Sequence, residues 1–413
     1  MKASLHGAPA VRVFACFALA YLLSYALRSI NAVIAPSLLA ELGMSNTDLG
    51  LLTSAYFVAF GSMQLPLGIW LDKYGPRRTE SALLLCAAAG AVVFATSATL
   101  TGLWIGRALI GIGVSACLVA SFKAYRQWFA LEQQPQLASW MLVAGTAGAL
   151  TATLPVTLAL PLVGWRGVFW IVAALLVAVS AAIFFLLRDV EARLADAPTV
   201  GAAAPVAGGY GHIFRNPYFR RMGLLGLINH GIFFALQSLW AGPWMTTVLG
   251  KSQQQTGEIL FVFNLVLMFA YLLMGWSAPR LVARGWSVHR LIAVGIAGMV
   301  LSQCAMLLTR VPSAWLLWLP LALCVPVMIL VQSHVGMAFP AALAGRANSA
   351  YNFQLFLGAF ATQWGFGLVV DVFKNHGVSP ADAFRYTLGV AIVLQATALV
   401  CFVINRAQPA EKA

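Results

Sequence analysis

Long apolar stretches, separated by short polar segments, run along almost the whole chain. Each is about 20 residues or longer, which is the length that an α-helix needs to cross a bilayer core of about 30 Å. The first stretch is too long for a removable signal peptide and carries Arg28 at its middle. The pattern predicts an all-α membrane protein with twelve transmembrane helices, near residues 11–39, 48–71, 79–98, 102–128, 137–161, 166–187, 219–247, 254–278, 288–309, 314–337, 345–372 and 380–404.

The composition supports a chain that is mostly embedded in lipid. Only 9% of its residues are charged and 61% are hydrophobic, whereas a soluble domain carries about 25% charged residues. Its six cysteines all lie in apolar stretches and form neither a CxxC pair nor a cluster with histidine. We therefore expect no disulfide, metal site or cofactor, and we interpret the cysteines as packing residues.

The basic residues are distributed unequally between the two sides of the predicted membrane. Of the 25 lysines and arginines, 17 fall on the side that holds both termini, five on the opposite side and three inside spans. The positive-inside rule then predicts cytoplasmic N- and C-termini in a bacterial-type inner membrane. The net charge of +13 is thus a topology signal, and we expect no nucleic-acid partner.

One long polar stretch divides the chain into a half at 1–187 and a half at 219–413, joined by a cytoplasmic linker at 188–218. The middle of this linker, residues 196–209, consists mostly of small residues without helical periodicity. The halves also resemble each other. YALRSINA in the first span matches FALQSLWA in the seventh, and Gly50 and Gly68 have glycines 207 positions later. A duplicated six-helix unit places the substrate site between the halves, near the bilayer midplane.

A glycine-rich polar loop follows the second span and reads GIWLDKYGPRR from Gly68 to Arg78. It resembles the cytoplasmic loop signature of the major facilitator superfamily, GxxxD followed by xxGRR, with Pro76 inserted before the arginine pair. Further marks of the family are Arg107-x-x-x-Gly111 in the fourth span and the GWRGVF segment that begins the sixth. The resemblance covers essentially the whole chain and implies a secondary transporter with this fold. Separately, we expect the protein to be a monomer.

The resemblance also implies roles for the loop residues. We expect Gly68 to permit close helix packing across the halves, Asp72 to pair with a basic residue across that interface, and the arginines to lie among lipid headgroups. The residues expected to control the conformational change are Gly68, Asp72, Gly75, Arg77, Arg78, Arg107 and Gly111. The fifth span lacks the Gly-Pro pair of the antiporter signature found in many drug exporters.

Arg28 is the most informative charge inside a predicted span, because a charged side chain at mid-bilayer costs about 2.5–3.5 kcal/mol. Tyr21, Tyr25, Arg28 and Asn31 are spaced to share one helix face. No acidic residue falls near the centre of any predicted span. A guanidinium there suits bidentate binding of a carboxylate or phosphate, although a structural arginine bonded to carbonyls remains the alternative.

The segment around Arg28 also resembles the first helix of organophosphate/phosphate antiporters and related organic-anion transporters, in which an arginine at this place binds the substrate anion. The second substrate arginine of that group is absent, because the repeat places Gln237 at its position.

Other polar residues in the spans are weaker candidates for the substrate site. Lys123 is either a second anion contact or a snorkelling lysine. Imidazole can carry a coupled proton near neutral pH, but a satisfied core histidine is the more common role for a residue such as His230. Trp240 and Trp244 near an outer end are more often interface anchors than substrate contacts. The remaining amide candidates are Gln237, Asn264, Gln332 and Asn352.

Three functions remain open at this stage. The first is transport of a small organic anion, coupled to a proton or to a counter-anion. The second is export of drugs, siderophores or other amphipathic molecules, which the lack of a membrane carboxylate disfavours. The third is a ligand sensor built on a transporter fold. An enzyme is not expected, because the chain has no nucleophile motif, metal cluster or phosphate-binding loop.

Overall fold

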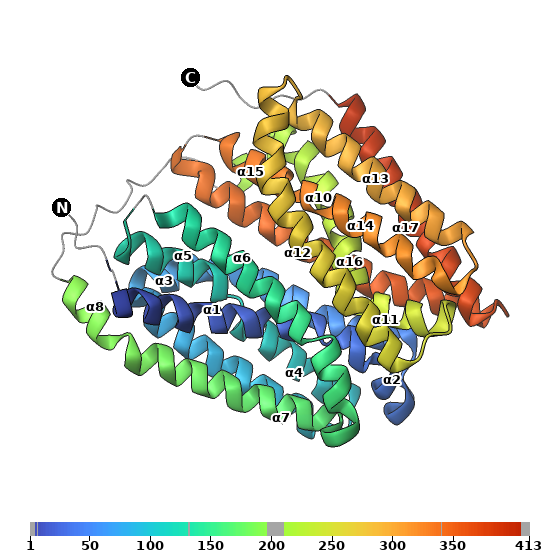
Figure 1. The fold of residues 1–413 in the computed structure, drawn as a ribbon, viewed down its shortest axis with the longest axis horizontal. Helices are drawn as coiled ribbons and strands as arrows, with labels where there is room; N and C mark the ends of the chain where they lie inside the picture. The colour runs from blue at the N-terminus through green and yellow to red at the C-terminus, as the bar shows by residue number, and fades with distance from the viewer. Residues whose placement is uncertain (1–4, 6, 131–132, 196–209, 340, 406–413) are drawn as a thin grey trace. The chain divides into compact units, whose positions relative to one another are not determined.

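The computed structural model describes residues 5, 7–130, 133–195, 210–339 and 341–405, and all regular elements in these ranges are helices (Figure 1). The first eight are α1 (Gly7–Ser29), α2 (Asn31–Leu42), α3 (Asn46–Thr96), α4 (Leu100–Gly113), α5 (Cys117–Trp128), α6 (Gln134–Thr151), α7 (Leu154–Leu186) and α8 (Arg188–Ala195). The others are α9 (Tyr210–Arg215), α10 (Pro217–Ala235), η2 (Leu236–Trp240), α11 (Ala241–Pro243), η3 (Trp244–Val248), α12 (Gln253–Ala283), α13 (Val288–Leu308), η4 (Pro312–Leu317), α14 (Trp318–Cys324), η5 (Val325–Val327), α15 (Met328–Met337), α16 (Ala341–Asn375) and α17 (Pro380–Ile404).

Two glycines divide the longest helices of the first half into successive spans. Gly75 in α3 has φ 77° and Gly164 in α7 has φ 65°, a backbone region that glycine enters without a steric penalty. Ten described helices are long and apolar enough to cross a membrane. The predicted spans at 48–71 and 137–161 fall on the first part of α3 and on α6 with the start of α7. The ten helices and these two further segments together account for the twelve predicted spans in the described part of the chain.

The chain forms two compact units. The N-terminal unit comprises Met1–Ser37 and Ala55–Ala202, and the C-terminal unit comprises Leu38–Ser54 and Ala203–Ala413. The predicted linker includes the helices α8 and α9, and its middle, 196–209, lies outside the described residues. The segment Leu38–Ser54 belongs to the predicted N-terminal half by its place in the sequence, but it groups with the C-terminal unit in the structure.

A cap on the N-terminus of α3 explains why this segment belongs to the C-terminal unit. The Asp371 carboxylate on α16 accepts hydrogen bonds from the Asn46 side chain at 2.8 Å, the Thr47 backbone N–H at 2.6 Å and the Thr47 hydroxyl at 2.7 Å. A carboxylate at this position satisfies N–H groups that lack partners within the helix and complements the helix dipole. A residue distant in sequence thus caps the beginning of α3.

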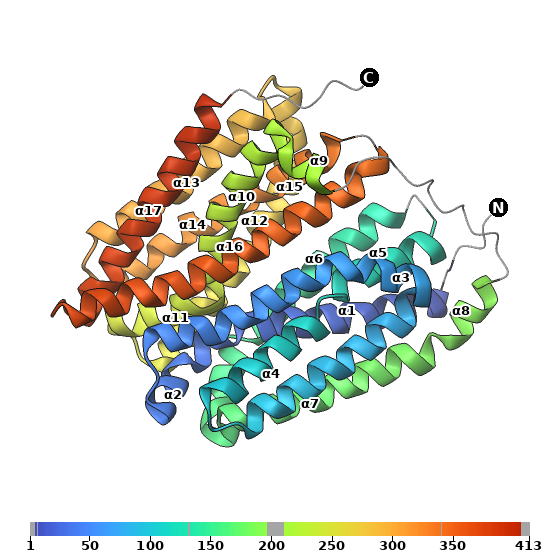
Figure 2. The same ribbon diagram turned by 180° about the vertical axis from the view of Figure 1, so that it is seen from behind.

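The two units use similar helix packing. In the N-terminal unit α1 packs against α6 and α7, and in the C-terminal unit α10 packs against α16 and α17 (Figure 2). A side chain at Gly148 of α6 would collide with the Leu22 carbonyl of α1, and one at Gly358 of α16 would collide with the Leu227 carbonyl of α10. Both contacts bring a helix into close approach with the helix that forms the first span of its predicted half, as expected for a duplicated sequence.

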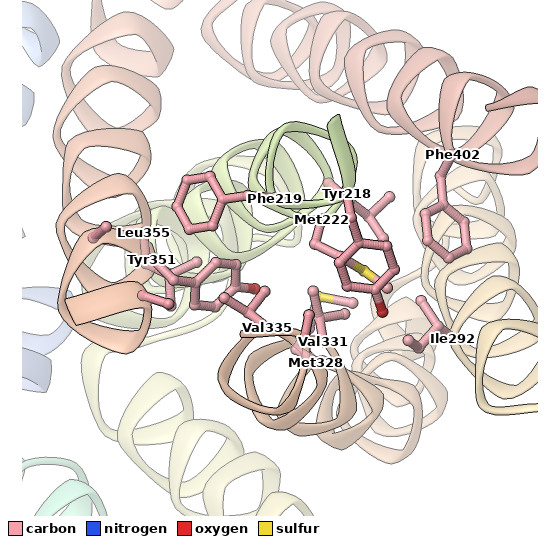
Figure 3. Close-up of a cluster of buried hydrophobic side chains, with 14 of the residues drawn as sticks. Tyr218, Phe219, Met222, Ile292, Met328, Val331, Val335, Tyr351, Leu355 and Phe402 are labelled. Carbon is pink, nitrogen blue, oxygen red and sulfur yellow. The ribbon is translucent and has the colours of Figure 1, made fainter. Parts of the chain in front are cut away.

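The C-terminal unit is held together at one end by a continuous apolar cluster (Figure 3). Tyr218, Phe219 and Met222 of α10 contribute to this cluster, and Val331 of α15 and Tyr351 of α16 lie in it as well. All five are at most 1% exposed. Because α10 is far from α15 and α16 in sequence, burial of this shared face fixes how α10 packs against them.

Candidate functional site

Arg28 lies on α1 and is 7% exposed, among aromatic rings of its own unit. Its guanidinium carbon is 4.6 Å from the centre of the Tyr25 ring, 5.4 Å from Phe60 and 5.9 Å from Tyr56. Tyr21 and Tyr25 pack edge to face, with ring centres 5.0 Å apart. The structure therefore brings together three of the four predicted residues of this face. Aromatic rings stabilise a desolvated cation through their negatively charged faces.

Tyr56 and Phe60 were not predicted as site residues, and they reach Arg28 from the second span. Gly111 explains their position, because a side chain there would collide with the Tyr56 carbonyl. This glycine allows α4 to approach the backbone of α3 closely at Tyr56. The four-residue spacing of Tyr56 and Phe60 places both rings on one helix face and is the sequence signal that could have revealed them.

The first span is not one continuous helix, which corrects the prediction for 11–39. It is interrupted at Ile30, so the fourth predicted residue, Asn31, begins α2 and is fully buried. Arg107 supplies a physical reason. Its Nη1 donates a hydrogen bond of 3.0 Å to the Leu27 carbonyl, which is the acceptor for the Asn31 N–H in a continuous helix. A side chain inserted at this ladder is a recognised cause of a helix kink.

Arg107 itself is fully buried and stacks over Phe94 and Phe169, with ring centres at 4.8 Å and 5.2 Å from the guanidinium carbon. Its contacts support a structural role next to Arg28. The seventh span departs from α-helical geometry at its repeat-related position, because η2 (Leu236–Trp240) is a π-helix that aligns with residues 27–31.

The predicted loop residues form two ion pairs inside the N-terminal unit. Lys123 contacts Asp72 at 2.5 Å, and Arg77 contacts Glu191 at 2.6 Å and donates to the Phe184 carbonyl at 2.6 Å. Asp72 therefore pairs within its own unit, rather than across the halves as expected. Lys123, a predicted anion contact, is engaged by Asp72 in this structure.

The other loop residues have simpler surroundings. Gly75 makes the turn described above, and Arg78 is exposed. Arg77 is 4% exposed, so its predicted place among lipid headgroups is wrong. A side chain at Gly68 would meet open space. The expected close packing at Gly68 is therefore not present within its own unit.

The candidates in the C-terminal unit form pairs of amides. Gln237 donates to Asn264 at 3.0 Å, and Gln332 donates to Asn352 at 3.0 Å. His230 is buried beside Phe234, and among the described residues its Nδ1 has no hydrogen-bond partner. His230 is therefore a core histidine as expected, but the expectation that its ring nitrogens are hydrogen-bonded is wrong for Nδ1.

Trp240 and Trp244 were interpreted as membrane-interface anchors, and the structure corrects this. Both side chains are at most 2% exposed. The Trp240 indole donates a hydrogen bond of 3.0 Å to the Gln363 carbonyl and stacks on Phe366. In this structure Trp240 therefore packs inside the C-terminal unit and is not exposed to a membrane interface.

An acidic residue lies deep in the N-terminal unit, against the expectation that the membrane interior holds no carboxylate. Glu80 follows the loop motif at the start of the third span and is fully buried. The prediction failed because Glu80 was placed at a span boundary, where contact with water or headgroups was expected. Within the described residues, no group of three His, Cys, Asp or Glu side chains is placed to hold a metal ion.

Ten described helices long and apolar enough to cross a bilayer, two compact units and buried charged groups on those helices indicate a polytopic membrane protein of the transporter class. The chain belongs to the Major Facilitator Superfamily, whose family model matches residues 17–362. This confirms the resemblance drawn from the loop motif and places the chain among transporters rather than enzymes.

Comparisons of sequence and structure agree with this assignment. The chain is 28% identical over 173 residues to a probable L-galactonate transporter of Escherichia coli K12, and 29% identical over 167 residues to the hexuronate transporter of that strain. These matches cover 42% and 40% of this chain, and 38% of each relative. The chain thus spans less than half the length of these relatives.

A longer match links the chain to the membrane sensor protein UhpC of Salmonella typhimurium LT2. It is 23% identical over 284 residues, which cover 64% of this chain and 63% of the sensor. Among solved structures, a bacterial homologue of the human lysosomal transporter Spinster superposes with a TM-score of 0.80 at 17% identity, covering 97% of both chains. This likeness confirms the predicted all-α fold with twelve transmembrane helices.

Proposed function

We propose that this chain transports a small organic anion that bears a carboxylate or phosphate, by exposing one binding site alternately to the two sides of the membrane. The observation that carries the proposal is Arg28, a cationic side chain buried on a membrane span with Tyr25, Tyr56 and Phe60 around it. Burying a guanidinium is costly, and an anion bound beside it offsets part of that cost. Its planar fork matches a carboxylate or phosphate in two parallel hydrogen bonds.

The identities of the relatives agree with this substrate class. L-Galactonate and hexuronates are sugar acids, and each carries one carboxylate with several hydroxyl groups. The amide pairs Gln237–Asn264 and Gln332–Asn352 offer the hydrogen-bonding groups that hydroxyls need, and the Tyr21 and Tyr25 side chains offer an aromatic face. We include these residues, with Asn31, Lys123, His230 and Trp240, in the proposed substrate path.

We also propose the membrane location, orientation, oligomeric state and coupling of the protein. Its charge distribution supports an inner-membrane location with both termini in the cytoplasm. We propose that it acts as a monomer and that transport is coupled to a proton or to exchange with a second anion.

The test of the proposed function is ligand binding and proteoliposome uptake with the Arg28→Gln and Arg28→Lys variants. Galactonate and glucuronate serve as anionic probes and a quaternary ammonium compound as the cationic probe. Arg28→Gln should weaken sugar-acid binding by about 2–5 kcal/mol, as for one partner of a buried charge pair. Arg28→Lys should restore binding only in part, because a point charge does not reproduce the planar fork.

Arg385→Gln is the matched control, because Arg385 is also buried on a helix but donates to the Leu307 and Thr309 carbonyls. It should bind the probe as wild type does once folded. Unchanged affinity in Arg28→Gln, or selective binding of the cationic probe, would refute the anion site. Tight sugar-acid binding without uptake would identify a sensor instead of a transporter.

A further inference from the structure

Glu80 is a buried carboxyl group that the proposed anion site does not explain. It lies on the third span, on the part of α3 that follows Gly75, and none of its surface is exposed. Within the described residues, no hydrogen bond of ordinary geometry reaches either of its carboxyl oxygens. An ionised carboxylate in such surroundings loses its hydration without gaining a counter-ion or a strong donor, whereas the neutral acid avoids most of that cost.

The groups that face Glu80 do not supply a compensating positive charge. From α5 the titratable neighbours are the Cys117 thiol, a weak donor, and the Tyr125 phenol, whose hydroxyl already contacts the Met141 sulfur at 3.2 Å. From α7, Ser180 donates to the backbone carbonyl of the neighbouring Ser81. From α1, Cys16 faces Tyr125.

The two cations that precede Glu80 on the same helix do not compensate it either, and the nearer one in sequence, Arg78, is exposed. Arg77 precedes Glu80 by one turn, and it is held by the Glu191 carboxylate and the Phe184 carbonyl. The carboxyl group of Glu80 is therefore surrounded by neutral groups.

A row of polar side chains connects Glu80 with the Arg28 site inside the same unit. Cys117 faces Glu80 on one side and Ser24 on the other, and the Tyr56 hydroxyl faces both Ser24 and Arg28. Ser24 donates a long hydrogen bond of 3.5 Å to the Val114 carbonyl, next to the break between α4 and α5. Cys117, Ser24 and Tyr56 therefore lie between the carboxyl group of Glu80 and the guanidinium of Arg28.

From this geometry we infer that Glu80 is a proton-binding site, and that its proton is coupled to the anion bound at Arg28 through Cys117, Ser24 and Tyr56. The coupling half of this inference rests on the proposed function, whereas proton binding by Glu80 does not. The step is a simple protonation, in which the carboxylate takes one proton from water and releases it to water when the surrounding helices open. A proton moving with a monovalent anion leaves no net charge to move against the membrane potential.

Infrared spectroscopy of the purified protein tests proton binding without any ligand. A protonated carboxylic acid has a C=O stretching band that an ionised carboxylate lacks, and the band shifts in heavy water. Wild type at neutral pH should show this band, and Glu80→Gln should lose it while remaining folded, because the amide is isosteric with the neutral acid. Glu258→Gln is the control, since Glu258 is an exposed glutamate on α12, and it should keep the band.

A spectrum without the band in wild type, or the same band in Glu80→Gln, would refute the proton site. Should Glu80→Gln fold poorly, the wild-type spectrum alone still decides whether a protonated acid is present.

Proteoliposome transport tests the coupling, with galactonate as the probe. A pH gradient should drive galactonate accumulation in wild type and in Glu258→Gln, and this accumulation should be lost in Glu80→Gln. Galactonate exchange across the membrane without a gradient should survive in Glu80→Gln. Gradient-driven accumulation that persists in Glu80→Gln would refute the coupling. If neither protein binds any sugar acid, the proposed function fails, and the infrared result still decides the proton site.

Discussion

The close approach of α6 to α1 gives a sharp test of the packing that positions Arg28. A methyl group at Gly148 would collide with the Leu22 carbonyl, which belongs to the helix backbone and cannot rotate away. Gly148→Ala must therefore separate the two helices or distort α1. Overpacking of this kind costs about 1–3 kcal/mol in well-packed interiors. The strain falls on the helix that carries Tyr21, Tyr25 and Arg28, so sugar-acid affinity should decrease together with stability.

The same substitution at other glycines provides matched comparisons. Gly358→Ala should be destabilising to a similar extent, because a methyl group there would collide with the Leu227 carbonyl of α10. Gly365→Ala in the same helix α16 should be neutral or stabilising by up to about 1 kcal/mol, since a methyl group there meets open space and alanine favours the helix. Only Gly148→Ala should affect the Arg28 site directly.

Thermal unfolding of the three variants in one detergent measures these differences, with circular dichroism as the signal. Sugar-acid affinity is then measured below the unfolding temperature of each variant. The reasoning would be refuted by a Gly148→Ala protein that melts at or above the wild-type temperature, or by a Gly365→Ala protein that loses as much stability as Gly148→Ala.

Two further predictions concern the loop motif and the topology. Asp72→Asn should change the unfolding free energy by at most about 1 kcal/mol, because its ion pair with Lys123 is solvent-exposed. It should nevertheless slow uptake by shifting the balance between conformers. An uptake rate equal to wild type in proteoliposomes would show that the pair has no role in transport. Reporter fusions after Asp196 and after Ala413 should both report the cytoplasm, given the uneven placement of basic residues, and a periplasmic signal from either fusion would contradict the proposed orientation.

The sequence by itself was sufficient for the class, the family and the number of spans. Each span is a local property, because about 20 apolar residues must satisfy their own backbone hydrogen bonds as a helix wherever lipid surrounds them. The loop from Gly68 to Arg78 could be recognised as a family motif from the sequence alone, because its residues are contiguous in the chain. Arg28, Tyr21 and Tyr25 could also be grouped in advance, because helical spacing alone places them together.

Contacts between helices could be decided only by the tertiary structure. The interruption at Ile30 follows a hydrogen bond from Arg107, which lies 80 residues beyond its acceptor Leu27. The ring of Tyr56 reaches Arg28 because Gly111 leaves room for its backbone. Asp72 forms an ion pair with Lys123 on α5. Glu80 is buried although it lies just after a polar loop. Hydropathy reports the average environment along a helix, whereas burial of one side chain depends on which neighbouring helices cover it, and those neighbours are fixed by packing across the fold.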